Sequence, residues 1–157
     1  MVSQSVTVEQ VKQWLEAVKD PEIPVISIAA LGILQGVRVD NGKVEVDIIP
    51  TYSGCPAMYV IQQDIKSVLA EHDIENVSIQ LLNDPIWTTD MITEAGRAAM
   101  SAYGIAPPQK AGEKDIACPQ CGSTDTRLIS QFGSTACKAM YRCESCLEPF
   151  DYFKCHA

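Results

Sequence analysis

Two C-x2-C pairs, Cys118 with Cys121 and Cys143 with Cys146, constrain what the C-terminal part of this 157-residue chain can fold into. Two residues between ligands let both sulfurs of a pair reach one ion from a tight turn, and two such pairs complete a tetrahedral four-sulfur site. A segment this short cannot bury a sufficient core, so a bound metal would supply much of its folding free energy. The spacing favours a zinc ribbon with a hairpin between the pairs. An iron–sulfur site or a redox dithiol is the alternative.

Three further cysteines fall outside these pairs. Cys137 and Cys155 are either core residues of the ribbon or, together with Cys55, a second set of thiolates that hold iron or a cluster transiently. The two histidines are weaker candidates for ligands. His72 ends a helical segment beside acidic residues, as a C-terminal cap would, and His156 lies in the tail.

Composition narrows the class of protein. With 46% apolar residues the chain can bury a core, and it has no apolar run long enough to span a membrane and no signal peptide. We therefore expect a cytoplasmic protein, in which clustered cysteines indicate metal or redox chemistry and not disulfides. Residues 1–104 carry six Lys/Arg and fourteen Asp/Glu, and residues 105–157 carry six of each. Neither part has the basic surface that nucleic acid requires.

A second candidate site is the segment 51–56, with the sequence TYSGCP. Apolar residues alternate before it, as in a strand, and recur at helical spacing after it, so it is a strand-to-helix turn. Gly54 permits a tight backbone, and Pro56 suits the first helical position. Cys55 would then lie at or next to the N-cap, where the helix dipole is expected to lower the thiol pKa. The alternative is a small buried apolar residue.

The first part of the chain has the order helix, strand, strand, helix, strand, helix. A capping box at Thr7 opens the first helix, and Asn41-Gly42 predicts a hairpin between strands at 34–39 and 44–49. The second helix runs from Pro56 to about 71, and a third strand at 77–81 should pair parallel to one of the first two. Thr88 or Thr89 is expected to cap a last helix that Gly104 ends.

These elements predict the α+β class, with helices packed against a three-stranded sheet and a C-terminal zinc-ribbon β module. The predicted division places the α+β domain at 1–104, a proline-containing linker at 105–114 and the ribbon at 115–157.

Several sequence blocks resemble known families. Segments 20–24 (DPEIP), 51–56 and 84–87 (DPIW) resemble the signature blocks of the SufT-like iron–sulfur assembly domain. Segments 132–139 (FGSTACKA) and 148–155 (EPFDYFKC) resemble the PaaD family, accessory proteins of aerobic phenylacetate degradation. Together the two similarities cover almost the whole chain, with no clear departure from either pattern.

The resemblance implies a role in maturing the multicomponent phenylacetyl-CoA epoxidase, not in catalysing the epoxidation. It implies delivery of iron or a [2Fe–2S] cluster, to the reductase subunit first and the di-iron oxygenase second. Cys55 matches the reactive cysteine of the assembly domain, and Asp20 and Glu22 match its acidic loop. The resemblance also implies ribbon ligands, here Cys118, Cys121, Cys143 and Cys146, and leaves Cys137 and Cys155 without a settled role.

Three alternatives remain at this point. The chain could be a non-catalytic structural subunit of the epoxidase, a thiol enzyme that uses Cys55, or a nucleic-acid-binding ribbon. A thiol enzyme lacks an obvious general base, since neither histidine has a suitable context, and the charge distribution disfavours nucleic acid. A homodimer is compatible with this domain class.

Overall fold

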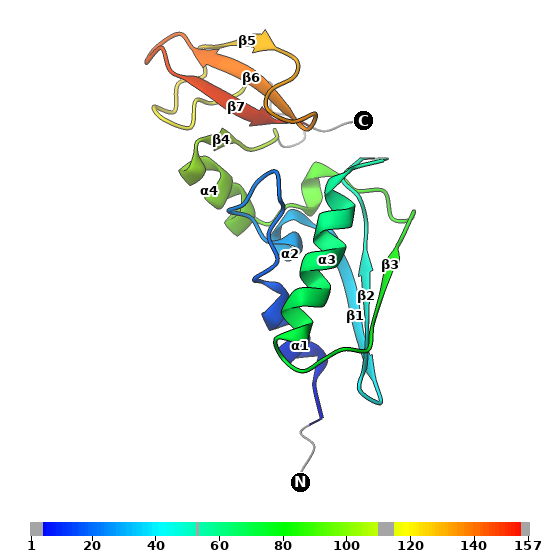
Figure 1. The fold of residues 1–157 in the computed structure, drawn as a ribbon. Helices are drawn as coiled ribbons and strands as arrows, with labels where there is room; N and C mark the ends of the chain where they lie inside the picture. Colours follow the sequence, from blue (N-terminus) through cyan, green and yellow to red (C-terminus); the bar gives the residue numbers. More distant parts are fainter. Residues whose placement is uncertain (1–4, 53, 110–114, 155–157) are drawn as a thin grey trace. The chain divides into compact units, whose positions relative to one another are not determined.

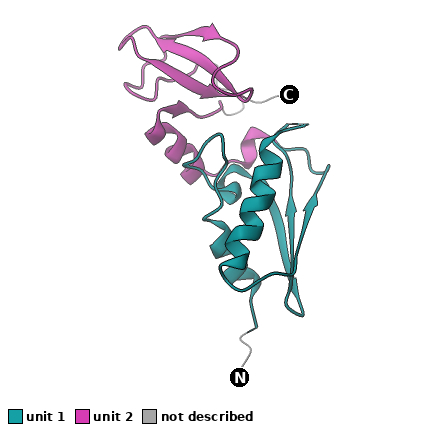
Figure 2. Ribbon diagram, viewed as in Figure 1, with its two compact units in different colours: residues 1–87 teal, residues 88–157 magenta. Residues whose placement is uncertain are grey.

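The computed structural model describes residues 5–52, 54–109 and 115–154, which form two compact units, Met1–Trp87 and Thr88–Ala157 (Figure 2). In these residues the first unit contains three helices and a mixed sheet, and the second contains a helix and a β module, which confirms the predicted α+β class. Within the described residues, no helix is both long enough and apolar enough to cross a membrane.

The sheet of the first unit has the order β1-β2-β3 (Figure 1). Strands β1 (Leu34–Asp40) and β2 (Lys43–Ile48) are antiparallel, and the turn between them has φ of 48° at Asn41 and 80° at Gly42. Positive φ at both central residues is the geometry that Asn-Gly favours, so the predicted hairpin is confirmed. Strand β3 (Val77–Leu81) pairs parallel to β2, also as predicted.

Three helices of the first unit pack on one face of this sheet (Figure 1). Helix α1 (Val8–Leu15) begins with the predicted capping box, in which the Thr7 hydroxyl accepts from the N–H of Gln10 and the Gln10 side chain accepts from the N–H of Thr7. Helix α3 (Ala57–Ala70) is the crossover that parallel strands require. The short α2 (Ile28–Leu31) was not predicted. The core that these elements bury is almost entirely aliphatic: Val11, Leu15, Val18, Ile23, Ile26, Ile28, Leu31, Ile33, Val44, Val46, Ile48, Ile61, Ile65 and Leu69.

The other face of the sheet carries an ion-pair network. The Arg38 guanidinium donates two hydrogen bonds to the Asp47 carboxylate, at 2.5 and 3.0 Å, and a third to Glu45 at 3.2 Å. This bidentate geometry suits a planar guanidinium. The Arg38 hydrogen bond keeps the pKa of the Asp47 carboxyl below its usual range, although partial burial opposes the shift.

The second unit begins with a short 3-10 helix η1 (Thr89–Met91) and continues into α4 (Glu94–Tyr103). The hydroxyl of Thr93 accepts from the N–H of Gly96 and caps α4, so the prediction of Thr88 or Thr89 as the cap is wrong. The 3-10 turn separates those two threonines from the helix start. Gly104 ends α4 with φ 91°, as predicted.

A four-stranded sheet of order β4-β7-β6-β5 forms the rest of this unit. Strands β5 (Thr126–Ser130) and β6 (Lys138–Cys143) form the predicted hairpin, and β7 (Pro149–Phe153) pairs antiparallel to β6. Strand β4 (Ile105–Ala106) pairs parallel to β7. The structure therefore differs from the predicted linker at its first two residues, because both side chains are apolar and become buried. The division at residue 104 itself stays a prediction.

We expect Asp47→Asn to lower the free energy of unfolding at pH 7 by about 1 kcal/mol, since a charge-assisted hydrogen bond is lost. A carboxyl whose pKa is lowered by folding stabilises the protein above its unfolded pKa of about 4, and this contribution is lost as pH falls through the lowered value. Urea unfolding at pH 7 and pH 3 should show the wild type and variant converging at the lower pH. An equal difference at both pH values would contradict this assignment.

Candidate functional site: a cysteine turn and a four-thiol cluster

The turn that carries Cys55 joins the end of β2 to the start of α3. The Cys55 N–H donates to the carbonyl of Tyr52 at 3.3 Å, and Gly54 adopts φ 75°, which glycine tolerates without strain. Pro56 occupies the N-cap position of α3 without a side-chain cap. Cys55 is therefore next to the N-cap, in agreement with the sequence prediction, and its carbonyl accepts from the N–H of Met58 at 3.3 Å.

The Cys55 side chain is buried, with 8% of its surface exposed, between the exposed residues Gly54 and Pro56. Burial raises the pKa of the Cys55 thiol above its usual value. Hydrogen bonds with the Ala57 backbone and the Tyr52 side chain act in the opposite direction but do not outweigh burial. The predicted lowering of this pKa is thus wrong, because desolvation of the thiolate exceeds the effect of the helix N-terminus.

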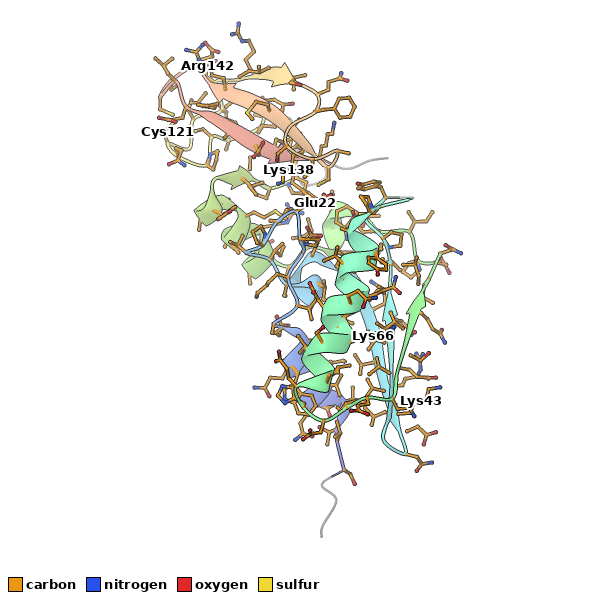
Figure 3. All side chains as sticks on the ribbon, in the orientation of Figure 1. Glu22, Lys43, Lys66, Cys121, Lys138 and Arg142 are labelled. Atoms are coloured by element: carbon orange, nitrogen blue, oxygen red, sulfur yellow. The ribbon has the colours of Figure 1, made fainter. Side chains whose placement is uncertain are left out.

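The acidic loop before α2 lies close enough to Cys55 to affect it. The negative charges of Glu22 and Asp20 each raise the pKa of the thiol further. The buried Asp20 carboxylate also accepts from the backbone N–H groups of Glu22 at 2.8 Å and Ile23 at 3.0 Å. Asp20 therefore holds the loop in shape as well as adding charge. The three residues predicted for this site are brought together, and Figure 3 labels Glu22 on this loop.

Sequence reasoning missed Tyr52 as part of this site. Its side chain forms a hydrogen bond with the Cys55 thiol that favours the thiolate. The available signal was its position three residues before the cysteine in a tight turn, where the two side chains can meet.

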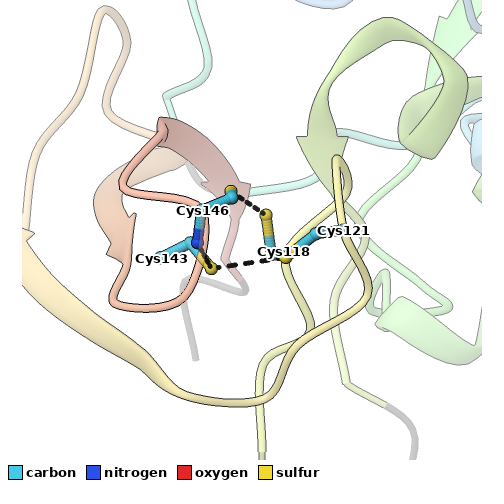
Figure 4. Close-up of side chains that lie close together, drawn as sticks. All are labelled: Cys118, Cys121, Cys143 and Cys146. Carbon is cyan, nitrogen blue, oxygen red and sulfur yellow. Dashed lines mark hydrogen bonds between the residues drawn. The ribbon is translucent and has the colours of Figure 1, made fainter.

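The second candidate site is the predicted four-cysteine cluster (Figure 4). The sulfurs of Cys118, Cys121, Cys143 and Cys146 all lie within 4.8 Å of one another. The shortest separations are 3.5 Å, between Cys121 and Cys143, and 3.7 Å, between Cys118 and Cys146. A tetrahedral zinc ion with Zn–S bonds of about 2.3 Å would place its sulfurs about 3.8 Å apart. The cluster thus has the size of a zinc site.

The backbone of both pairs is arranged as a metal knuckle. The N–H of Gln120 donates to the sulfur of Cys118 and the N–H of Cys146 donates to that of Cys143, each at 3.4 Å. Gly122 and Leu147, which follow the two pairs, have φ of 76° and 67°. Glycine adopts this conformation without strain, as at Gly122. Leu147 adopts the same conformation although its side chain disfavours it.

Four thiols at these distances cannot ionise independently. The hydrogen bond from the Cys146 N–H lowers the pKa of Cys143 to about 6. The N–H of Glu148 lowers the pKa of Cys146, but burial and the neighbouring thiols outweigh it and raise that pKa to about 12. A divalent cation at the centre would remove this conflict, since coordinated thiols are deprotonated.

The other predicted thiols and histidines do not join either site in the described residues. Cys137 is buried in the second unit, with its sulfur 3.1 Å from the Thr135 hydroxyl. His72 follows α3 and stacks on Trp14, with ring centroids 4.0 Å apart. Cys155 and His156 lie outside the described residues. Convergence of Cys55, Cys137 and Cys155 therefore stays a prediction.

Comparison with known proteins divides the chain between two families. Residues 8–80 match the family described as iron-sulfur cluster assembly protein, and residues 106–154 match the PaaD zinc beta ribbon domain. A Staphylococcus aureus (strain USA300) protein named Fe-S protein maturation auxiliary factor SufT is 36% identical over 52% of this chain and 93% of its own.

Solved structures resemble the assembly domain. A crystal structure of a DUF59 domain from Bacillus anthracis has 27% sequence identity and a TM-score of 0.55, and it covers 59% of this chain and 90% of its own.

One relative spans both parts of the chain. A protein of Escherichia coli (strain K12) that is named as a subunit of 1,2-phenylacetyl-CoA epoxidase is 43% identical over 94% of this chain and 93% of its own. This similarity extends over the Cys55 turn, the acidic loop and all four cysteines of the cluster. The chain therefore belongs to the PaaD family, in which an iron–sulfur cluster assembly domain is followed by a zinc beta ribbon.

Proposed function

We propose that this protein is a non-catalytic maturation factor that delivers iron or an iron–sulfur cluster to a phenylacetyl-CoA epoxidase. The reductase subunit is the first candidate recipient and the di-iron oxygenase the second. The observation that carries the proposal is a single cysteine at a helix N-terminus beside two carboxylates, within an iron–sulfur assembly domain and outside the four-thiol cluster. The identity of the recipient enzyme is inferred from the name of the E. coli relative.

The chemistry of the Cys55 turn suits transient binding. Its raised pKa keeps the thiol protonated at neutral pH, so binding of an iron species requires loss of the proton. The negative charges of Asp20 and Glu22 disfavour an empty thiolate but attract a cation. The helix N-terminus and the Tyr52 hydrogen bond stabilise the thiolate once it forms. One protein thiolate holds a metal less firmly than four, which allows release to a recipient.

The four-cysteine cluster would bind zinc as a resident ion through Cys118, Cys121, Cys143 and Cys146. Zinc bound there supplies charge neutralisation and cross-links the two knuckles. Two of the four cysteines, Cys118 and Cys143, also belong to the small apolar core of the ribbon with Ala106 and Phe150. Cys137 and Cys155 are candidate accessory thiols for the cargo.

A non-catalytic structural subunit is the second candidate function, since the relative is named as a subunit. A structural subunit should be present at a fixed stoichiometry in the active epoxidase complex. A maturation factor is instead dispensable after the oxygenase has been assembled, so removing the protein from purified active epoxidase separates the two.

Cys55→Ser should leave the fold and zinc content unchanged and should reduce the support of epoxidase activity in cells by at least tenfold, because the only soft ligand of the turn is lost. Activity of the epoxidase in a strain that lacks the wild-type protein is the measurement. Zinc content and thermal unfolding of the variant, which should equal those of the wild type, are the controls. Full activity with Cys55→Ser would refute the role of this thiol.

Glu22→Gln should lower the pKa of the Cys55 thiol, because it removes a negative charge that opposes ionisation. The thiolate fraction at pH 7 then rises, and Cys55 should be alkylated by iodoacetamide faster than in the wild type. Peptide mass spectrometry resolves Cys55 from the other cysteines. Asp64→Asn, a change of similar charge in the middle of α3, is the control. An unchanged rate would show that the loop does not act on the thiol.

Cys121→Ser should remove most of the bound zinc, about one ion per chain in the wild type, and unfold the ribbon, because a structural zinc site contributes directly to folding. Zinc analysis together with thermal unfolding monitored by circular dichroism tests this. The first unit should keep its secondary structure. Loss of function with zinc and stability unchanged would show that the ligands have been misassigned.

A further inference from the structure

Two side chains near the Cys55 turn are unusually exposed for their size. Ile86 is 80% exposed and Tyr59 is 70% exposed, the highest values among the large apolar residues that the structure describes. Val60, beside Tyr59 on α3, is 41% exposed. Burying such side chains in water-excluding contacts is favourable, and tyrosine is a frequent anchor of protein interfaces.

The topology of the sheet places these side chains at one end of the first unit. Strands β2 and β3 are parallel, and the N–H of Leu82 donates to the carbonyl of Ile48 at 2.8 Å, so the loops that follow the two strands leave the sheet side by side. The loop after β2 contains Cys55 and leads into the first turn of α3, and the loop after β3 contains Ile86. Figure 1 shows α3 beginning at the end of the sheet where both strands finish.

The charge at this end is mainly negative. The acidic loop (residues 20–24) contains Asp20 and Glu22, the loop after β3 (residues 82–87) contains Asp84, and the exposed Lys19 directly precedes the acidic loop. Residues 1–87 as a whole carry five Lys/Arg and twelve Asp/Glu. Figure 3 shows Lys43 at the opposite end of this unit from Glu22, and Lys43 is paired with Glu45.

We propose that Tyr59, Val60 and Ile86, with the carboxylates of Glu22 and Asp84, form a docking surface for the protein that receives the cargo of Cys55, and that this recipient presents basic groups around an apolar contact. We call this set the elbow face. The inference rests on the proposed function, because it names the partner of the same site. The apolar side chains supply contact area, and the carboxylates set the orientation and rate of association.

Charge favours a basic recipient over a second copy of this chain. A symmetric contact between two elbow faces would bring Glu22 and Asp84 of one copy against the same acidic surface of the other. Like charges that face one another across an interface are unfavourable. A basic partner gains attraction from the same groups, and its approach would bring the acceptor site to the buried thiol.

The test is binding of the full-length protein to the purified apo-reductase and, separately, to the oxygenase, at low and high salt. Tyr59→Ser combined with Ile86→Ser should weaken binding to one of them by at least tenfold. Ile129→Ser combined with Phe132→Ser is the matched control, since these ribbon residues are 53% and 63% exposed. Both double variants replace one isoleucine and one aromatic residue by serine. Wild-type affinity should fall as salt rises. Zinc content and thermal unfolding of both double variants should equal those of the wild type.

Other outcomes overturn the inference. The inference fails if the elbow-face variant binds as well as the wild type, or if the ribbon control weakens binding more. It also fails if binding does not depend on salt, or if neither protein binds. Wild-type self-association that the elbow-face variant abolishes would assign the surface to a second copy instead. Cys55→Ser separates the two proposals, because it should bind the recipient normally but fail to transfer. If Cys55→Ser transfers normally, the proposed function fails even where docking is confirmed.

Discussion

The parallel pairing of β2 with β3 determines where Cys55, the candidate functional thiol of the first unit, lies. Parallel neighbours cannot be joined by a tight turn, so the chain must cross the sheet, and α3 is that crossover. A helix that follows one strand and precedes its parallel neighbour begins at the carboxyl end of both. Cys55 is the residue before the α3 N-cap, so the pairing fixes it at the edge where polar loops converge. The hydrogen bond between Leu82 and Ile48 holds the second loop beside the first.

The second unit depends on a different constraint. In the described residues its sheet buries a small apolar cluster, to which two of the four clustered cysteines themselves belong. Tyr141 packs against this cluster and makes aromatic contacts with Phe150 and Tyr152. Such a core is too small to stabilise a module of this size by burial alone. A common ion would join the two knuckles, so the fold of the ribbon and its candidate metal site depend on the same four cysteines.

The sequence predicted features that depend on local chemistry. The Asn-Gly hairpin, the capping box, the Gly54 turn and the four-cysteine cluster each follow from a few neighbouring residues. Prediction from the sequence failed for features that depend on packing between residues far apart in the chain. The pKa of Cys55 is raised by burial that no local motif encodes, and β4 forms because Ile105 and Ala106 find an open edge of β7. The cap of α4 was missed because a 3-10 turn at Thr89–Met91 competes for the same stretch.

Under the proposed function, the two thiol sites have different chemical requirements, and this favours keeping them apart. A closed cage of four sulfurs supplies every ligand that zinc requires, so exchange with a recipient would have to break several bonds. A single buried thiol supplies one ligand and leaves the remaining positions to the recipient, to solvent or to other thiols. Ligands from an incoming protein can then replace it one at a time. Burial contributes to the same end, because it disfavours an empty thiolate and so limits binding to cargo that compensates the loss of the proton. An iron carrier built on the four-thiol cluster would bind too firmly to release, whereas one built on Cys55 can bind and release at a docked partner.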